Sequence, residues 1–111
     1  MRTIENRTDN FTKRDAINVR NGSALKDHGG EEIEIVKTCT GTDVDEETGE
    51  VKRFGAFITS SGDCLTFISE NAIETALDLI EIINEEESSV SCRVDIRKSN
   101  GGREFIALIL L

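Results

Sequence analysis

The chain has 111 residues, with 13 basic and 22 acidic side chains and a formal net charge of −9. This length accommodates one compact domain, and no apolar run approaches the roughly 20 residues of a membrane-spanning helix. Cys39, Cys64 and Cys92 are scattered singly, and the N-terminal residues lack the apolar stretch of a secretory signal. We therefore expect a cytoplasmic protein with buried free thiols and no contact with a membrane.

The acidic residues are concentrated in two segments of the chain. Residues 43–50 hold five acidic side chains and residues 70–87 hold seven, and neither segment contains a lysine or an arginine. The ten acidic residues elsewhere are outnumbered by all 13 basic ones, so the rest of the chain is mildly basic. Because salt screens charges beyond about 8–10 Å, a local basic surface can persist on this acidic protein.

Residues 1–30 are predicted to form a polar N-terminal arm, and residues 31–111 a separate domain. Within the arm, Thr12 and Asp15 are spaced as in a capping box, in which each side chain bonds the other's backbone N–H. This spacing predicts a short helix that ends near Val19.

Alternating β-branched and polar residues predict strands over residues 32–40 and 51–60, which pair as a hairpin around the acidic residues 43–50. A third strand follows over residues 64–68. The tip of the hairpin is expected to be solvated.

A helix is predicted after Ser69, which is a good N-cap residue. Apolar residues recur at helical spacing from Ile73 to Ile83, and acidic residues occupy the opposite side. Ile68 is expected to pack on Ile73 as a hydrophobic staple. The acidic run at residues 85–87 indicates where the helix ends.

Two strands are predicted to close the chain. Residues 90–97 alternate strictly, and the turn at residues 99–102 leads into an almost unbroken apolar strand over residues 103–111. A strand with two apolar faces needs cover on both of them. A homo-oligomer is therefore one prediction, with a second copy covering the last strand.

This order of elements, three strands, one helix and two strands, is that of the OB-fold. We predict a mainly β protein, a five-stranded OB-like Greek-key barrel with one helix between strands three and four and a short N-terminal helical arm. An open antiparallel sheet with one helix packed on it fits the same elements and is the alternative.

Motifs of catalysis and of cofactor binding are absent from the sequence. It contains no GxGxxG, no P-loop, no HExxH and no GxSxG, and no cluster has the spacing of metal ligands. We therefore predict a protein that is not an enzyme and that needs neither a cofactor nor a metal.

The segment from Arg97 to Phe105 concentrates three cations, Arg97, Lys98 and Arg103, around a glycine-rich turn and one aromatic ring. In an OB-fold this segment is the loop between strands four and five, which flanks the oligonucleotide groove. Cations there neutralise phosphates, and an aromatic ring stacks on a base. An ordinary solvated hairpin with Phe105 in the core is the alternative.

Three residues outside this segment complete the predicted interface. Arg53 and Phe57 face outward if Phe54 and its even-numbered neighbours fill the barrel, and they then place a stacking ring beside a phosphate-binding cation. Alternation leaves the opposite orientation open, with Phe57 buried. Lys37 either reaches the groove or extends its amine to solvent.

The segment Arg97–Ile106 resembles a "K-S-x-x-G-R-E-F/Y" segment of small single-stranded-DNA-binding proteins of phages that infect Gram-positive bacteria. The first residues, Ile4–Thr8 followed by Phe11–Lys13, are similar to the same group. The resemblance implies an OB-type protein that coats single strands during phage replication. The chain departs from better-known single-strand binders in having few aromatic residues and an apolar C-terminal segment, Leu108–Leu111, where they carry an acidic tail.

The leading prediction is a sequence-tolerant single-stranded-DNA-binding protein of phage DNA replication or recombination, active in the host cytoplasm. A second hypothesis is an acidic protein-binding module that mimics DNA toward a host enzyme, because the acidic helix face suits a basic partner. A host or phage replication protein is a further predicted partner. The predicted DNA contacts are Arg53, Phe57, Arg97, Lys98, Arg103 and Lys37.

Overall fold

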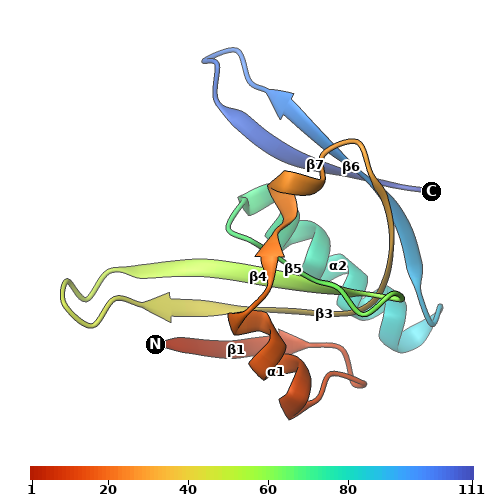
Figure 1. Cartoon of the computed structure of the whole chain (residues 1–111), viewed down its shortest axis with the longest axis horizontal. Coiled ribbons are helices and arrows are strands. Elements are labelled where there is room, and N and C mark those ends of the chain that lie inside the picture. Colours follow the sequence, from red (N-terminus) through yellow and green to blue (C-terminus); the bar gives the residue numbers. More distant parts are fainter.

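A computed structural model describes residues 1–111 as one curled sheet with two α-helices (Figure 1). The elements in chain order are β1 (Arg2–Arg7), α1 (Lys13–Arg20), β2 (Ser23–Ala24), the 3-10 turn η1 (Leu25–His28), β3 (Glu32–Val44), β4 (Val51–Thr59), β5 (Cys64–Phe67), α2 (Glu70–Glu85), β6 (Val90–Lys98) and β7 (Glu104–Leu110). Neither helix has the length and apolar content that crossing a bilayer requires.

The predicted mainly β, barrel-like fold is confirmed, but the description with five strands and one helix is wrong. The sheet has seven strands. The arm supplies the two extra ones, since β1 pairs antiparallel with β3 and β2 pairs parallel with β5, and α1 lies between them in the chain. The sequence did not reveal β1 because its polar residues show no apolar alternation, so its strand conformation depends on pairing with β3.

β3 is the strand that curls the sheet. It pairs with β4 from Ile35 to Val44 and with β6 from Glu32 to Ile35, and its register shifts between Ile35 and Lys37. Such an irregularity bends a strand, so the β3–β4 and β6–β7 hairpins extend in different directions (Figure 1). The strand order β2-β5-β4-β3-β6-β7 ends in β2 and β7, which do not pair. Because β2 pairs only with Leu65 and Thr66 of β5, the half-barrel stays open between the remainder of β5 and β7.

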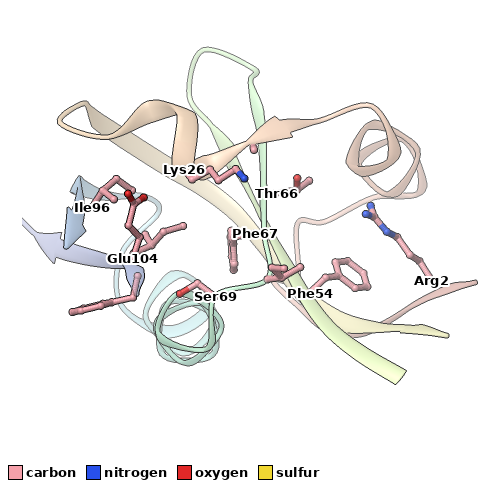
Figure 2. Close-up of a pocket in the computed structure, with 12 residues that line it drawn as sticks. Arg2, Lys26, Phe54, Thr66, Phe67, Ser69, Ile96 and Glu104 are labelled. Atoms are coloured by element: carbon pink, nitrogen blue, oxygen red, sulfur yellow. The ribbon is translucent and has the colours of Figure 1, made fainter. Parts of the chain in front are cut away.

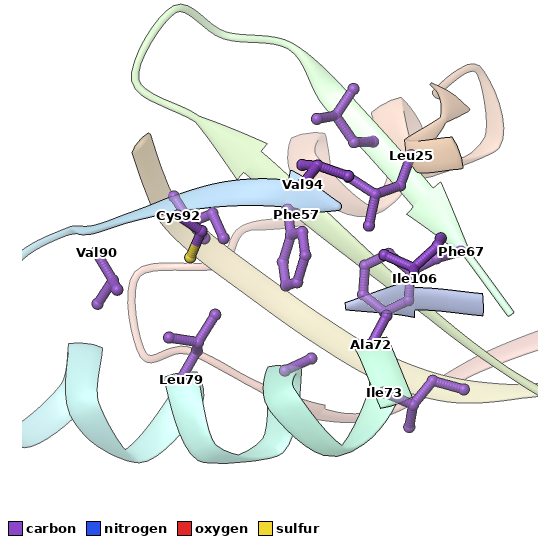
Figure 3. Close-up of a cluster of buried hydrophobic side chains, with 13 residues drawn as sticks. Leu25, Phe57, Phe67, Ala72, Ile73, Leu79, Val90, Cys92, Val94 and Ile106 are labelled. Atoms are coloured by element: carbon purple, nitrogen blue, oxygen red, sulfur yellow. The ribbon is translucent and has the colours of Figure 1, made fainter. Parts of the chain in front are cut away.

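The main core lies between the concave side of the sheet and α2 (Figure 3). Apolar residues at helical spacing on α2, among them Ile73, Ala76 and Leu79, are fully buried against the strands. Phe57 of β4 is also fully buried in this core. The predicted outward orientation of Phe57 is therefore wrong.

A second core on the other face of β4 explains this error. Phe54, Ala56 and Ile58 pack there with Phe11 and Val19 of the arm. Both faces of β4 are covered, one by α2 and one by the arm, so alternation along the strand cannot tell which set of residues meets the helix. The division of the chain at residue 30 stays a prediction, since the arm contributes to the sheet and to both cores.

Candidate nucleic-acid interface

A groove opens where the half-barrel is not closed, between β5 and the β6–β7 hairpin (Figure 2). Its volume is about 400 Å³, and we call it the central groove. Phe67 lies midway along it, with Ile96 and Glu104 toward one end and Phe54 and Arg2 toward the other (Figure 2). The lining residues are Arg2, Ala24, Lys26, Phe54, Thr66, Phe67, Ile68, Ser69, Ile96, Glu104, Phe105 and Ile106.

The floor of the central groove depends on a glycine. Gly55 of β4 is the register partner of Phe67, and a Cβ atom at Gly55 would overlap the Phe67 ring. The absence of a side chain lets this ring lie across β4 and pack against Phe57, with ring centroids 4.5 Å apart and planes tilted by 44°. Phe67 is thereby held in a fixed position with a small part of its surface facing the groove.

Two isoleucines add exposed apolar surface beside this ring. Ile68 is 73% exposed and Ile96 is 37% exposed, and both line the groove. The predicted staple between Ile68 and Ile73 is therefore wrong, because Ile68 is exposed at the groove while Ile73 is buried in the main core. Apolar side chains gathered in an exposed concave surface mark a binding site more often than chance.

The groove carries one cation that has no carboxylate partner. Its charged side chains are Arg2, Lys26 and Glu104, two cations against one carboxylate. Lys26 is exposed and makes no ion pair. The Arg2 guanidinium carbon lies 5.0 Å from the centre of the Phe54 ring, and its Nε is 3.6 Å from Asp43 Oδ2. The two acidic segments lie on the β3–β4 hairpin and α2, and each reaches the edge of the groove, through Asp43 beside Arg2 and through Glu70, which follows Ser69.

The β6–β7 hairpin continues from the end of the groove at Glu104 and carries the predicted cations. Arg97, Lys98 and Arg103 are all exposed there. Arg97 Nη2 lies 3.3 Å from Asp95 Oδ2, whereas Lys98 and Arg103 make no ion pair. The hydrogen bond from Arg93, helped by the one from Arg97, holds the pKa of Asp95 below its ordinary value. Lys98 and Arg103 are thus the two free cations of this hairpin.

Arg53, Phe57 and Lys37 lie outside the groove lining. Arg53 Nη1 is 2.8 Å from Glu70 Oε2 and 3.7 Å from Glu74 Oε1, so two carboxylates of α2 offset its charge. Phe57 offers no exposed surface to a base. The predicted interface residues are therefore not gathered on one surface.

Lys37 is held by the arm. Its Nζ lies 2.9 Å from Asp15 Oδ2, and the same oxygen accepts a 2.7 Å hydrogen bond from the backbone N–H of Thr12. The predicted capping box of Thr12 and Asp15 is confirmed. Burial by itself would raise the pKa of Asp15, but the hydrogen bonds from Lys37 and Thr12 hold that pKa below its ordinary value. This ion pair joins β3 to the start of α1.

Two basic groove residues, Arg2 and Lys26, were not expected from the sequence. They are isolated cations in the arm, which holds six bases against four acids over residues 1–30. That modest excess of positive charge is the one signal that pointed toward them. The pairing of β1 with β3 and of β2 with β5 brings them to the central groove.

A curled β sheet with an apolar groove at its open side and exposed cations at and beside that groove is an arrangement found in nucleic-acid-binding β proteins. A family model described as "Phage Single-stranded DNA-binding protein" matches residues 6–111. The chain belongs to this family, and it is a single-stranded-DNA-binding protein of phage DNA replication. The family is one of DNA-binding, non-catalytic proteins. Among curated proteins and among solved structures, no match was found.

Proposed function

We propose that single-stranded DNA binds in the central groove, with its bases against Phe67, Ile68 and Ile96. Phosphates contact Lys26 beside the groove and Lys98 on the β6–β7 hairpin. The proposal is supported chiefly by the opening between β5 and β7, where apolar side chains and the unpaired Lys26 share one concave surface. Phe67 is 5% exposed, so it offers a base an apolar contact at the floor of the groove and not a full stacking face.

The lining of the central groove supports binding without sequence preference. It contains no Asn or Gln, the side chains that read adenine edges, and its basic side chains are only Arg2 and Lys26. Apolar contacts accept any base, because every base has a π face. We infer that the protein coats single strands in the host cytoplasm irrespective of their sequence.

The cations differ in how freely a phosphate can bind to them. Lys98 and Arg103 make no ion pair, although Glu104 is the cross-strand partner of Lys98, so both cations are open to a phosphate. Arg97 shares its charge with Asp95, and Arg53 with two carboxylates of α2, so both contribute less. Lys37 serves the fold through its ion pair with Asp15.

In this proposal β3–β7 and α2 correspond to an OB-type barrel, and β1, α1 and β2 are additions to it. The central groove then lies over the second and third barrel strands, β4 and β5, beside the loop between the last two. OB-folds bind oligonucleotides at that place.

Fluorescence anisotropy with labelled oligo-dT at low salt tests the groove. Lys26→Ser and Lys98→Ser are each expected to raise the Kd about three- to tenfold and to lower the slope of log K against log salt by about 0.7, because each removes one phosphate contact. Lys13→Ser, an exposed unpaired lysine at the start of α1, is the matched control and leaves the Kd unchanged. Equal losses in all three variants, or none in the first two, contradict the proposed groove.

We further propose that copies of the protein associate through β7. This strand forms an edge of the sheet, and Leu110 and Leu111 at its end are 48% and 62% exposed. An exposed apolar edge is a template for pairing with another strand. Light scattering is expected to show a mass that rises with protein concentration, and Leu110→Glu is expected to remove that rise. A monomeric mass for the unmodified chain at every concentration contradicts this association.

A further inference from the structure

A second groove lies next to the central groove, among β1, α1 and the β3–β4 hairpin. Its volume is about 580 Å³, and we call it the N-terminal groove. Ile4 of β1 and Ala16 and Val19 of α1 supply apolar surface to it, and Arg20 at the end of α1 supplies a cation. Arg20 is exposed and makes no ion pair. This combination repeats the chemistry of the central groove.

The two grooves meet at one pair of side chains. Arg2 and Phe54 line both of them. The guanidinium of Arg2 lies over the Phe54 ring, 5.0 Å from its centre, and Nη1 donates a 3.4 Å hydrogen bond to the carbonyl oxygen of Val19 in α1. A planar cation held over an aromatic ring is a surface on which a base can stack. Arg2 and Phe54 thus form a bridge between the grooves.

Resting on the function proposed above, we propose that single-stranded DNA continues from the central groove over Arg2 and Phe54 into the N-terminal groove. A further nucleotide binds there, with its base against Ile4 and Ala16 and its phosphate at Arg20. The bound strand then spans the open side of the half-barrel and the arm. The arm is accordingly part of the DNA-binding surface.

The charges of the N-terminal groove give the strand an orientation. Arg20 comes from α1, whereas the carboxylates Asp43 and Glu46 come from the β3–β4 hairpin. Asp43 is offset by the Met1 amino group at 3.2 Å and by Arg2 at 3.6 Å, whereas Glu46 makes no ion pair. A phosphate in this groove is therefore attracted to Arg20 and repelled mainly by Glu46. The phosphate therefore lies at Arg20, at the C-terminal end of α1.

Binding of labelled oligo-dT of increasing length, from about 4 to about 16 nucleotides, distinguishes one groove from two. Arg20→Ser is expected to bind the shortest oligonucleotides as the wild type does, because these occupy the central groove. It is expected to bind the longest ones about three- to tenfold more weakly, because the added nucleotide loses its phosphate contact. Arg14→Ser is the matched control, an exposed unpaired arginine on the same helix that lines neither groove.

The same binding experiment with Lys26→Ser distinguishes DNA binding in the central groove from its continuation into the N-terminal groove. Lys26→Ser is expected to weaken binding at every length, because its contact lies in the central groove. If Arg20→Ser has the wild-type Kd for every oligonucleotide length while Lys26→Ser binds more weakly, DNA does not bind in the N-terminal groove, and the proposal for the central groove still holds. If the wild-type chain binds no oligonucleotide, or if Lys26→Ser binds every length with the wild-type Kd, the proposal that DNA binds in the central groove is contradicted instead.

Discussion

Phe57 and Phe67 pack against each other as a tilted aromatic pair, but only Phe67 also reaches the central groove. Phe57 lies between α2 and the strands and is fully buried (Figure 3). Phe67 belongs to the same core, but part of its ring reaches the central groove. A buried ring stabilises the fold through apolar burial and close packing, so substitutions at these positions should separate stability from DNA binding.

Phe57→Leu is expected to lower the free energy of unfolding by about 1–2 kcal/mol, because the smaller side chain leaves a cavity beside Phe67. The Kd of the folded variant for oligo-dT should stay close to the wild-type value. Urea unfolding and fluorescence anisotropy measure the two quantities. A marked loss of affinity without a loss of stability would show that the Phe57 ring contacts DNA.

Gly55→Ala is expected to impair both properties. The added methyl group overlaps the Phe67 ring, and relieving such an overlap costs about 1–3 kcal/mol. Because Phe67 is displaced from the groove floor, the Kd for oligo-dT rises even under conditions where the variant is fully folded. The same two measurements apply, with Phe57→Leu as the comparison that loses stability only. Unchanged affinity would mean that Phe67 does not contact the bases.

Among the elements, α1 has contacts with β3 and with Arg2 that hold together the region where the two grooves meet. Its first turn is held by the capping box of Thr12 and Asp15 and by the ion pair of Asp15 with Lys37. Its last turn holds Arg2 through the carbonyl oxygen of Val19. The helix therefore connects the sheet to the place where the two grooves meet.

The contribution of Asp15 to stability is expected to depend on pH. Because the pKa of Asp15 in the folded chain lies below its ordinary value, the ionised carboxylate stabilises the fold at pH values above the unfolded-state pKa. This stabilisation is lost as the pH falls through the folded-state pKa. At pH 7 Asp15→Asn should be less stable by about 1–3 kcal/mol, from the weakened cap and charged hydrogen bonds.

Urea unfolding of the wild type and of Asp15→Asn between pH 7 and pH 3 tests this pH dependence, because the stabilities of the two proteins should become more similar as the pH falls. The wild type should lose stability below pH 4 toward the level of Asp15→Asn, since protonation removes the same charge that the substitution removes. Thr12→Ala weakens the cap without changing a titratable group, so it should stay less stable than the wild type at both ends of this range. A constant gap between wild type and Asp15→Asn would mean that the charge of Asp15 is not what stabilises α1.

At the scale of the whole molecule, the net charge of −9 is distributed so that the grooves can still bind an anion. The acidic segments occupy the tip of the β3–β4 hairpin and the surface of α2, whereas the β6–β7 hairpin carries two free cations. These hairpins extend in different directions (Figure 1). Carboxylates that lie beyond a screening length of about 8–10 Å from the DNA repel it weakly, whereas Asp43 and Glu46 line the N-terminal groove and act on the strand there.

We therefore expect modest affinity with a steep dependence on salt, with a Kd of about micromolar or weaker at moderate salt. Replacing Glu85, Glu86 and Glu87 by Gln should strengthen binding to oligo-dT slightly at low salt. The effect should vanish near 0.15 M salt, where charges are screened within about 8 Å. Anisotropy at two salt concentrations measures it. A large effect that persists at high salt would place these carboxylates beside the DNA.

Much of the fold could be predicted because its determinants are local. The spacing of apolar residues on α2, the alternation in β3, β4 and β6, and the capping box of Thr12 and Asp15 all act within a few residues of the chain. Two of the proposed DNA contacts, Lys98 and Arg103, were also found, since they flank a turn that the glycines make evident. β1 could not be found in this way, because its conformation depends on a partner strand.

The amino-acid sequence by itself determined the barrel-forming strands, α2, the cationic β6–β7 hairpin and a resemblance to phage single-strand binders. Only the tertiary structure decided which face of β4 meets α2, and so that Phe57 is buried while Phe67 reaches the groove. It also brought Arg2 and Lys26 of the arm to the opening between β5 and β7. The reason is physical: helix periodicity and turn geometry are set by neighbouring residues, whereas a groove forms from strand pairings between segments far apart in the chain.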